Sequence, residues 1–146
     1  MTVTFFGHRD CPEAIRLQLQ HILEDLIADG ADYFYVGNQG QFDGMVISLL
    51  SKLKTAYPQI EYAVVLAYMP GTVKAETVDP RHPTVFPEGL EDVPRRFAIT
   101  HRNRWMIDAS DCVVAYVTHS WGGVAQFIEL AEKKGKRVIR LKRPVL

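Results

Sequence analysis

The sequence predicts an α/β fold built on a parallel sheet. Short apolar runs alternate with longer stretches whose apolar residues recur at helical spacing, and this alternation is typical of βαβ units. The chain has 146 residues, of which 47% are hydrophobic and 23% charged. These values are ordinary for one folded domain with its own core, so we expect residues 1–146 to form a single domain.

Five short apolar runs are predicted as strands. Each is bounded by glycine, proline or polar residues, which favours a strand over part of a buried helix. The expected strands are, approximately, Val3–Phe6, Tyr33–Val36, Ile60–Tyr68, Cys112–Val117 and Arg137–Leu141.

Four amphipathic stretches between these runs are predicted as helices. In the first, Asp10 is expected to be the N-cap and Glu13 to complete a capping box, and Gly30 ends the helix. The second ends before Pro58, and the third follows Pro94. The fourth runs from about Val124 to Lys134, with Gly135 following its C-terminus.

The connections then predict the strand order. Because parallel crossovers are right-handed, the long connection after the third strand lets the chain return across the sheet, giving the order 3-2-1-4-5. With helices on both faces, this is a Rossmann-like three-layer sandwich. Residues 69–94, which supply that connection, carry five prolines and five acidic residues without sustained periodicity. A loop this long is usually functional or disordered, so a lid over a site and a passive surface excursion both remain open.

Charge and cysteine content limit the classes of function. Lysine plus arginine and aspartate plus glutamate each number 17, so no net field attracts nucleic acid, and we do not expect a nucleic-acid partner. Cys11 and Cys112 suit a reducing compartment. No apolar run is long enough to span a bilayer, and no signal peptide is recognised, so we expect a cytoplasmic protein without membrane contact. The five histidines show no metal-ligand spacing, so neither a metal nor a cofactor is expected.

Two unusual turns follow the strands between which the predicted order reverses, where open parallel sheets bind ligands. They read GHRD, from Gly7 to Asp10, and HSWGG, from His119 to Gly123. Gly7 permits a sharp turn or a close approach, and Arg9 suits a phosphate or carboxylate, although pairing with a surface acid is an equal alternative. Gly122 and Gly123 precede a helix whose first amides are free to bind an anion.

The turn after the second strand and the helix before the fourth add further candidates. Gly37 and Gly40 flank the turn, and Asp43 either caps the next helix or reaches a sugar or base. Arg102 shares a helix face with Met106, which places it near the apolar boundary, although a charged surface is the commoner use of such arginines. Glu129 is either a solvent-facing glutamate or a site residue, and the apolar residues around it do not decide between the two.

Taken together, four segments resemble the SLOG superfamily, in particular its short GHR-bearing branch of bacterial and phage proteins. They read FFGHRD, VGNQGQFDGMV, HRNRWMIDASDCVVAY and SWGGVAQFIELA, and they span nearly the whole chain. The resemblance implies a Rossmann-like fold, a nucleotide or nucleotide-derived ligand such as an ADP-ribose-like signal, and a homodimer or higher homo-oligomer. His8 and Ser120 join the expected ligand contacts.

The superfamily includes phosphoribohydrolases that cleave the N-glycosidic bond of nucleoside 5'-monophosphates with the motif PGGxGTxxE. Matched position by position, the resemblance implies that Gly122 and Gly123 hold phosphate and that Glu129 and Arg102 are catalytic. Trp121 replaces the motif's proline, and Ala125 and Gln126 replace Gly-Thr, which removes a hydroxyl hydrogen bond to phosphate. The sequence therefore favours binding, as a sensor or sequestering module, over hydrolysis.

Overall fold

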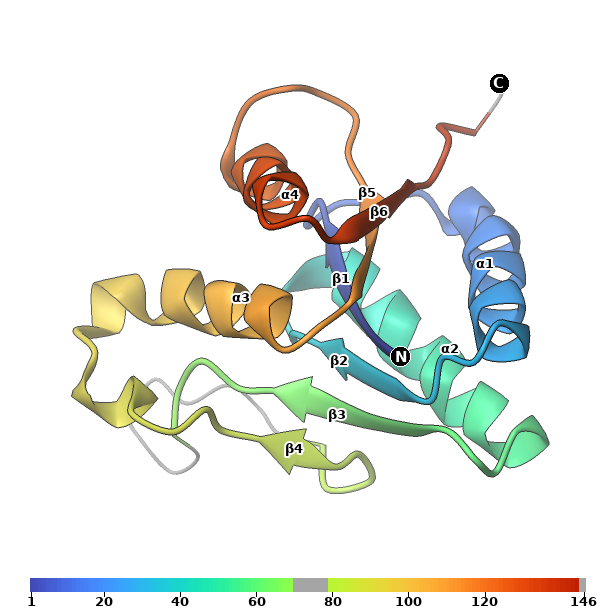
Figure 1. Cartoon of the computed structure of the whole chain (residues 1–146), viewed down its shortest axis with the longest axis horizontal. Coiled ribbons are helices and arrows are strands. Elements are labelled where there is room, and N and C mark those ends of the chain that lie inside the picture. Colours follow the sequence, from blue (N-terminus) through green and yellow to red (C-terminus); the bar gives the residue numbers. More distant parts are fainter. Residues whose placement is uncertain (70–78, 145–146) are drawn as a thin grey trace.

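The computed structural model describes residues 1–69 and 79–144, and in them six strands form one parallel sheet. The order is β4-β3-β2-β1-β5-β6 (Figure 1). The expectation of an α/β fold with a parallel sheet is therefore confirmed. The strands are β1 Thr2–Gly7, β2 Tyr33–Val36, β3 Glu61–Val65, β4 Thr84–Val85, β5 Cys112–Tyr116 and β6 Arg137–Arg140.

The predicted count of five strands is wrong, and the order of the whole sheet differs accordingly. β4 lies at the sheet edge beyond β3, inside the segment that was expected to be a loop. It is held by backbone hydrogen bonds: the Val64 amide donates to the Pro83 carbonyl at 2.8 Å, and the Leu66 amide donates to the Val85 carbonyl at 2.8 Å. A two-residue strand shows no periodicity, so the sequence pattern could not indicate it. The lid hypothesis concerns residues 69–94, and residues 70–78 of that segment lie outside the described residues.

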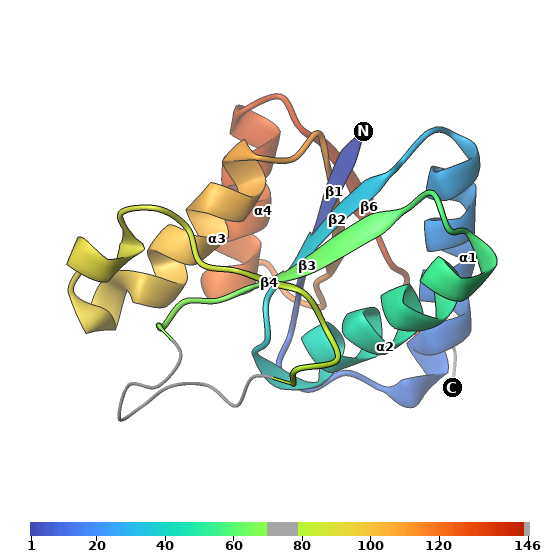
Figure 2. The same ribbon diagram turned by 90° about the horizontal axis from the view of Figure 1, so that it is seen from below.

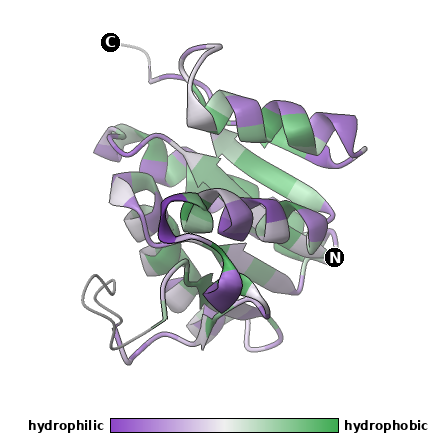
Figure 3. Ribbon diagram, turned by 90° about the vertical axis from the view of Figure 1, so that its left-hand side faces the viewer, coloured by the Kyte–Doolittle hydropathy of each residue, from purple (hydrophilic) through white to green (hydrophobic). Residues whose placement is uncertain are grey.

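Four α-helices cover the two faces of the sheet (Figures 1 and 2). α1 and α2 pack on one face, and α3 and α4 pack on the other. Figure 3 shows hydrophobic residues concentrated along the strands and polar residues interspersed along the helices. No helix of the described part of the chain is long and apolar enough to cross a membrane. The helices are α1 Arg16–Ala28, α2 Gly40–Ala56, α3 Ala98–Asp108 and α4 Gly123–Lys133.

The predicted start of the first helix is wrong. A 3-10 turn at Glu13–Ile15 precedes α1, and neither it nor α1 has a side-chain cap. Pro12 restricts Cys11 to extended conformations, so the helix cannot begin at Asp10. Glu13 instead forms an ion pair with Arg16, one turn further along.

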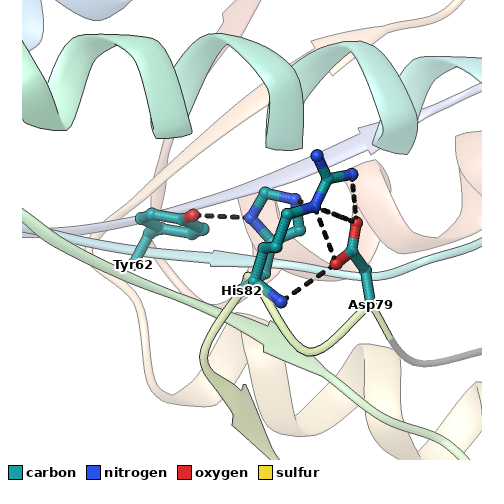
Figure 4. A network of polar contacts seen from close by, with 4 residues as sticks. Tyr62, Asp79 and His82 are labelled. Atoms are coloured by element: carbon teal, nitrogen blue, oxygen red, sulfur yellow. Dashed lines mark hydrogen bonds and ion pairs between the residues drawn. The ribbon is translucent and has the colours of Figure 1, made fainter.

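A polar network joins β3 to the chain just before β4 (Figure 4). The Tyr62 hydroxyl lies 2.7 Å from Nδ1 of His82, and Nε2 of the same ring lies 3.7 Å from Asp79 Oδ2. Hydrogen bonds from the Arg81 side chain hold the pKa of Asp79 well below its usual range, so its carboxylate stays ionised. An ionised carboxylate near Nε2 favours a proton on that nitrogen, which leaves Nδ1 to accept from the tyrosine hydroxyl.

We expect Tyr62→Phe to lower the free energy of unfolding by about 1 kcal/mol, because it removes the hydrogen bond to His82 while keeping the buried ring. Urea unfolding followed by circular dichroism measures this difference. Tyr57→Phe is the matched control, because the Tyr57 hydroxyl makes no hydrogen bond within the described residues. Equal stabilities of the two variants would show that the network does not stabilise the β4 edge.

Candidate functional site

A pocket of about 340 Å³ lies at the carboxyl edge of the sheet. β1 lies there between β2 and β5. The chain adds β2, β3 and β4 on one side of β1 and then adds β5 and β6 on its other side. The pocket therefore occupies the topological switch point, where open α/β sheets bind ligands. Residues from β1, α2, α3 and α4, from the turn after β1 and from the turn before α2 line it. Those predicted as site residues are Gly7, Arg9, Asp43, Arg102 and Gly123.

Gly7 serves packing within this pocket. A Cβ at this position would lie 2.3 Å from two ring carbons of Phe42, a fully buried side chain of α2. The close approach that glycine permits here is therefore made by an aromatic ring of the same chain.

Arg102 is the largest side chain among those that the structure buries fully, with an exposure of 2%. Its Nη1 donates to the Val65 carbonyl at 3.0 Å, and its Nε donates to Asn103 Oδ1 at 2.8 Å. The sequence placed Arg102 near the apolar boundary, and the docking of α3 on the sheet takes it fully inside. A buried charge persists only where hydrogen bonds and counter-charges support it.

Asp43 and Gly37 lie next to Arg102. The buried Asp43 accepts a hydrogen bond from the Gln39 amide through Oδ2 at 2.9 Å, so it does fix the turn before α2. A Cβ on Gly37 would lie 2.9 Å from Asp43 Oδ2 and 3.1 Å from Arg102 Nη1. Glycine is therefore needed at residue 37, because the Asp43 carboxylate and the Arg102 guanidinium both pack closely against its Cα.

Arg9 is exposed and brings a cation to the pocket lining. Its carbonyl accepts from the Gln41 amide at 2.7 Å, which ties the GHRD turn to the start of α2. Gly40, at φ +86°, makes this contact possible, because a Cβ there would lie 2.7 Å from the Arg9 Cα. Gly40 thus acts through the arrangement of the two turns, outside the pocket lining.

His8 joins the GHRD turn to the turn after β5. Its Nε2 accepts from the Thr118 amide at 2.9 Å, so the ring binds there in the neutral form. Burial lowers the pKa of His8, and the neighbouring His119 lowers it further. Because β1 and β5 are adjacent in the sheet, this bond fixes the relative positions of the two turns that flank the switch point.

The Gly122–Gly123 turn brings the start of α4 to the pocket. Gly122 adopts φ +91°, a conformation that glycine reaches without strain, and its carbonyl accepts from the Gln126 amide at 3.1 Å to open the helix. Gly123 is the first residue of α4 and lines the pocket. Amides of a first helical turn have no partner within the helix and favour anions.

Glu129 and Ser120 lie elsewhere. They border a second pocket of about 450 Å³ between α4 and the ends of β5 and β6. Glu129 is not among the residues that line the pocket at the switch point. The Glu129 side chain is 68% exposed and pairs with Lys133 at 3.4 Å. In this arrangement it is a solvent-facing helical glutamate, the first of the two interpretations that the sequence left open.

Several pocket residues were not among the predicted site residues. Gln39, Thr100 and Phe127 line the pocket beside the expected ones, as does Asn103. For Gln39 and Asn103 the only indication in the sequence was their closeness to predicted site residues. Gln39 lies between Gly37 and Gly40, and Asn103 follows Arg102. Within the described residues, no cluster of histidine, cysteine, aspartate and glutamate could hold a metal ion.

No protein-family model matches this chain, and a search of curated proteins finds no significant match. The chemistry of the site is therefore inferred from its own residues.

Proposed function

We propose that this chain binds a nucleotide or a nucleotide derivative in the switch-point pocket. The observation that carries the proposal is the composition of the lining: an exposed arginine, a helix start, and a buried carboxylate beside a buried guanidinium. The volume of about 340 Å³ falls in the range of small-molecule sites. The resemblance to the SLOG superfamily supports the same class of ligand, in a cytoplasmic homo-oligomer with a Rossmann-like fold.

Two parts of a nucleotide, the phosphate and the sugar, have counterparts in the lining. Arg9 and the first amides of α4 suit a phosphate, because a guanidinium fork and a helix N-terminus both favour anions. Asp43 suits a ribose hydroxyl, because a carboxylate accepts hydrogen bonds from it. Binding is proposed without a reaction, since Glu129 lines a different pocket and is paired with Lys133.

Isothermal titration against AMP, ADP-ribose, NAD and cyclic AMP tests the proposal. We expect at least one of them to bind, and Arg9→Ala to weaken that binding by about tenfold to a hundredfold, because a hydrogen bond to a charged group is lost.

Arg137→Ala is the matched control. It removes an exposed arginine at the first residue of β6, at the opposite edge of the sheet, and should leave the affinity unchanged. If none of the four compounds binds, or if both variants behave alike, the proposed site is wrong.

A further inference from the structure

An exposed aromatic stack joins the GHRD turn to the turn after β5. Trp121 is 70% exposed, the highest value among the exposed large apolar side chains of the described residues. Its ring stacks on His119 at 4.2 Å between centroids, and His119 stacks on His8 at 4.3 Å. The rings of His8 and Tyr116 then meet in a T-shaped arrangement, with 5.9 Å between their centroids. Because Tyr116 belongs to β5, the stack packs against that strand.

His119 holds the exposed tryptophan in two ways, by a hydrogen bond to its backbone and by stacking on its ring. His119 Nδ1 lies 2.7 Å from the Trp121 carbonyl oxygen, which can only accept, so the imidazole donates. His8 is fixed in turn by its bond to the Thr118 amide. An aromatic ring that is already ordered loses little conformational entropy when a second ring packs on it.

The stack connects the two turns that build the pocket. His8 lies between Gly7 and Arg9, both of which line the pocket, and Trp121 comes two residues before Gly123, which also lines it. On the other side, His119 borders the second pocket, of about 450 Å³. A group bound through Arg9 and the start of α4 thus has a flat, apolar surface within the same pair of turns.

We propose that Trp121 is the surface on which the aromatic base of the bound nucleotide stacks. This inference rests on the proposed function and adds the base as the recognised part of the ligand. Nucleobases stack on tryptophan with little dependence on base identity, because every base has a π face. His119 and the neutral His8 lie behind Trp121 in the stack, where they support its ring and add no requirement for specific hydrogen bonds to the base.

The test compares ligands with and without a base. AMP, ADP-ribose, NAD and cyclic AMP are titrated into the wild-type chain, and ribose 5-phosphate serves as the probe without a base. We expect Trp121→Ala to weaken the binding of the adenine compounds by about tenfold or more and Trp121→Phe to retain most of it. Ribose 5-phosphate should bind the three proteins equally, and Leu17→Ala, which removes another exposed apolar side chain, should change nothing.

Fluorescence gives an independent readout, because the chain has two tryptophans and the other one, Trp105 of α3, packs against Tyr35 of β2. Ligand binding should quench the wild-type emission, and Trp121→Phe should abolish the quenching. If adenine compounds bind wild type and Trp121→Ala equally, the stacking inference is overturned while the proposed function stands. If no compound binds the wild type, both fail. A change of oligomeric state in Trp121→Ala without a change in affinity would assign the ring to a subunit interface and overturn the inference.

Discussion

Arg102→Ala is expected to lower the free energy of unfolding by about 3–5 kcal/mol, the largest loss that we predict from a single substitution. The side chain is 2% exposed, so its removal leaves a cavity at the junction of α3 with the sheet. The Val65 carbonyl, to which Nη1 donates at 3.0 Å, also loses its guanidinium donor in a buried place. Each of these losses costs a few kcal/mol in typical proteins.

Chemical unfolding in urea, followed by circular dichroism, measures this difference. The matched control is Arg104→Ala, which removes an exposed arginine from the same helix and should change the stability by less than about 0.5 kcal/mol. Equal effects of the two substitutions would contradict the structural role assigned to Arg102. Because Arg102→Ala perturbs the fold, Arg9→Ala is the better probe of ligand binding.

Gly7→Ala is expected to lower the free energy of unfolding by about 1–3 kcal/mol, the cost of overpacking a filled core. The added Cβ would lie 2.3 Å from carbons of the Phe42 ring, and Phe42 is fully buried and stacked on Tyr116, with 6.4 Å between ring centroids. The ring therefore has little room to move aside. Gly44→Ala is the control of opposite sign: it lies in α2 with nothing within 4 Å of its added Cβ, and it should gain about 1 kcal/mol from helix propensity.

A double-mutant cycle separates the clash from other effects of alanine at residue 7. Phe42→Leu alone should destabilise the chain, because it leaves part of the core unfilled. In the Gly7→Ala background the same substitution should cost less, because it also relieves the contact. Strict additivity of the two changes would show that the Phe42 ring does not explain the glycine.

The sequence by itself predicted the four helices, five of the six described strands and the edge of the sheet at which the candidate pocket lies. The run Tyr33–Val36 matches β2 at both ends, because apolar residues there stop abruptly at polar and glycine-bearing turns. The parallel α/β arrangement followed from the alternation of periods, which depends on local composition alone. The turns with GHRD, VGNQG and HSWGG all follow strands, so a parallel sheet necessarily brings them to its carboxyl edge.

Only the tertiary structure decided which of these residues meet. Phe42 explains Gly7 although the two are far apart in the chain, and Arg102 is buried because α3 packs over Val65 of a different strand. Glu129 has apolar neighbours on both sides in the sequence, so the face of α4 on which it lies depended on which neighbour packs against the sheet. In the structure Ile128 is the buried neighbour, and Glu129 faces solvent. The periodicity of apolar residues indicates the secondary structure of one segment. Contacts between segments depend on how separate elements pack, and no single segment contains that information.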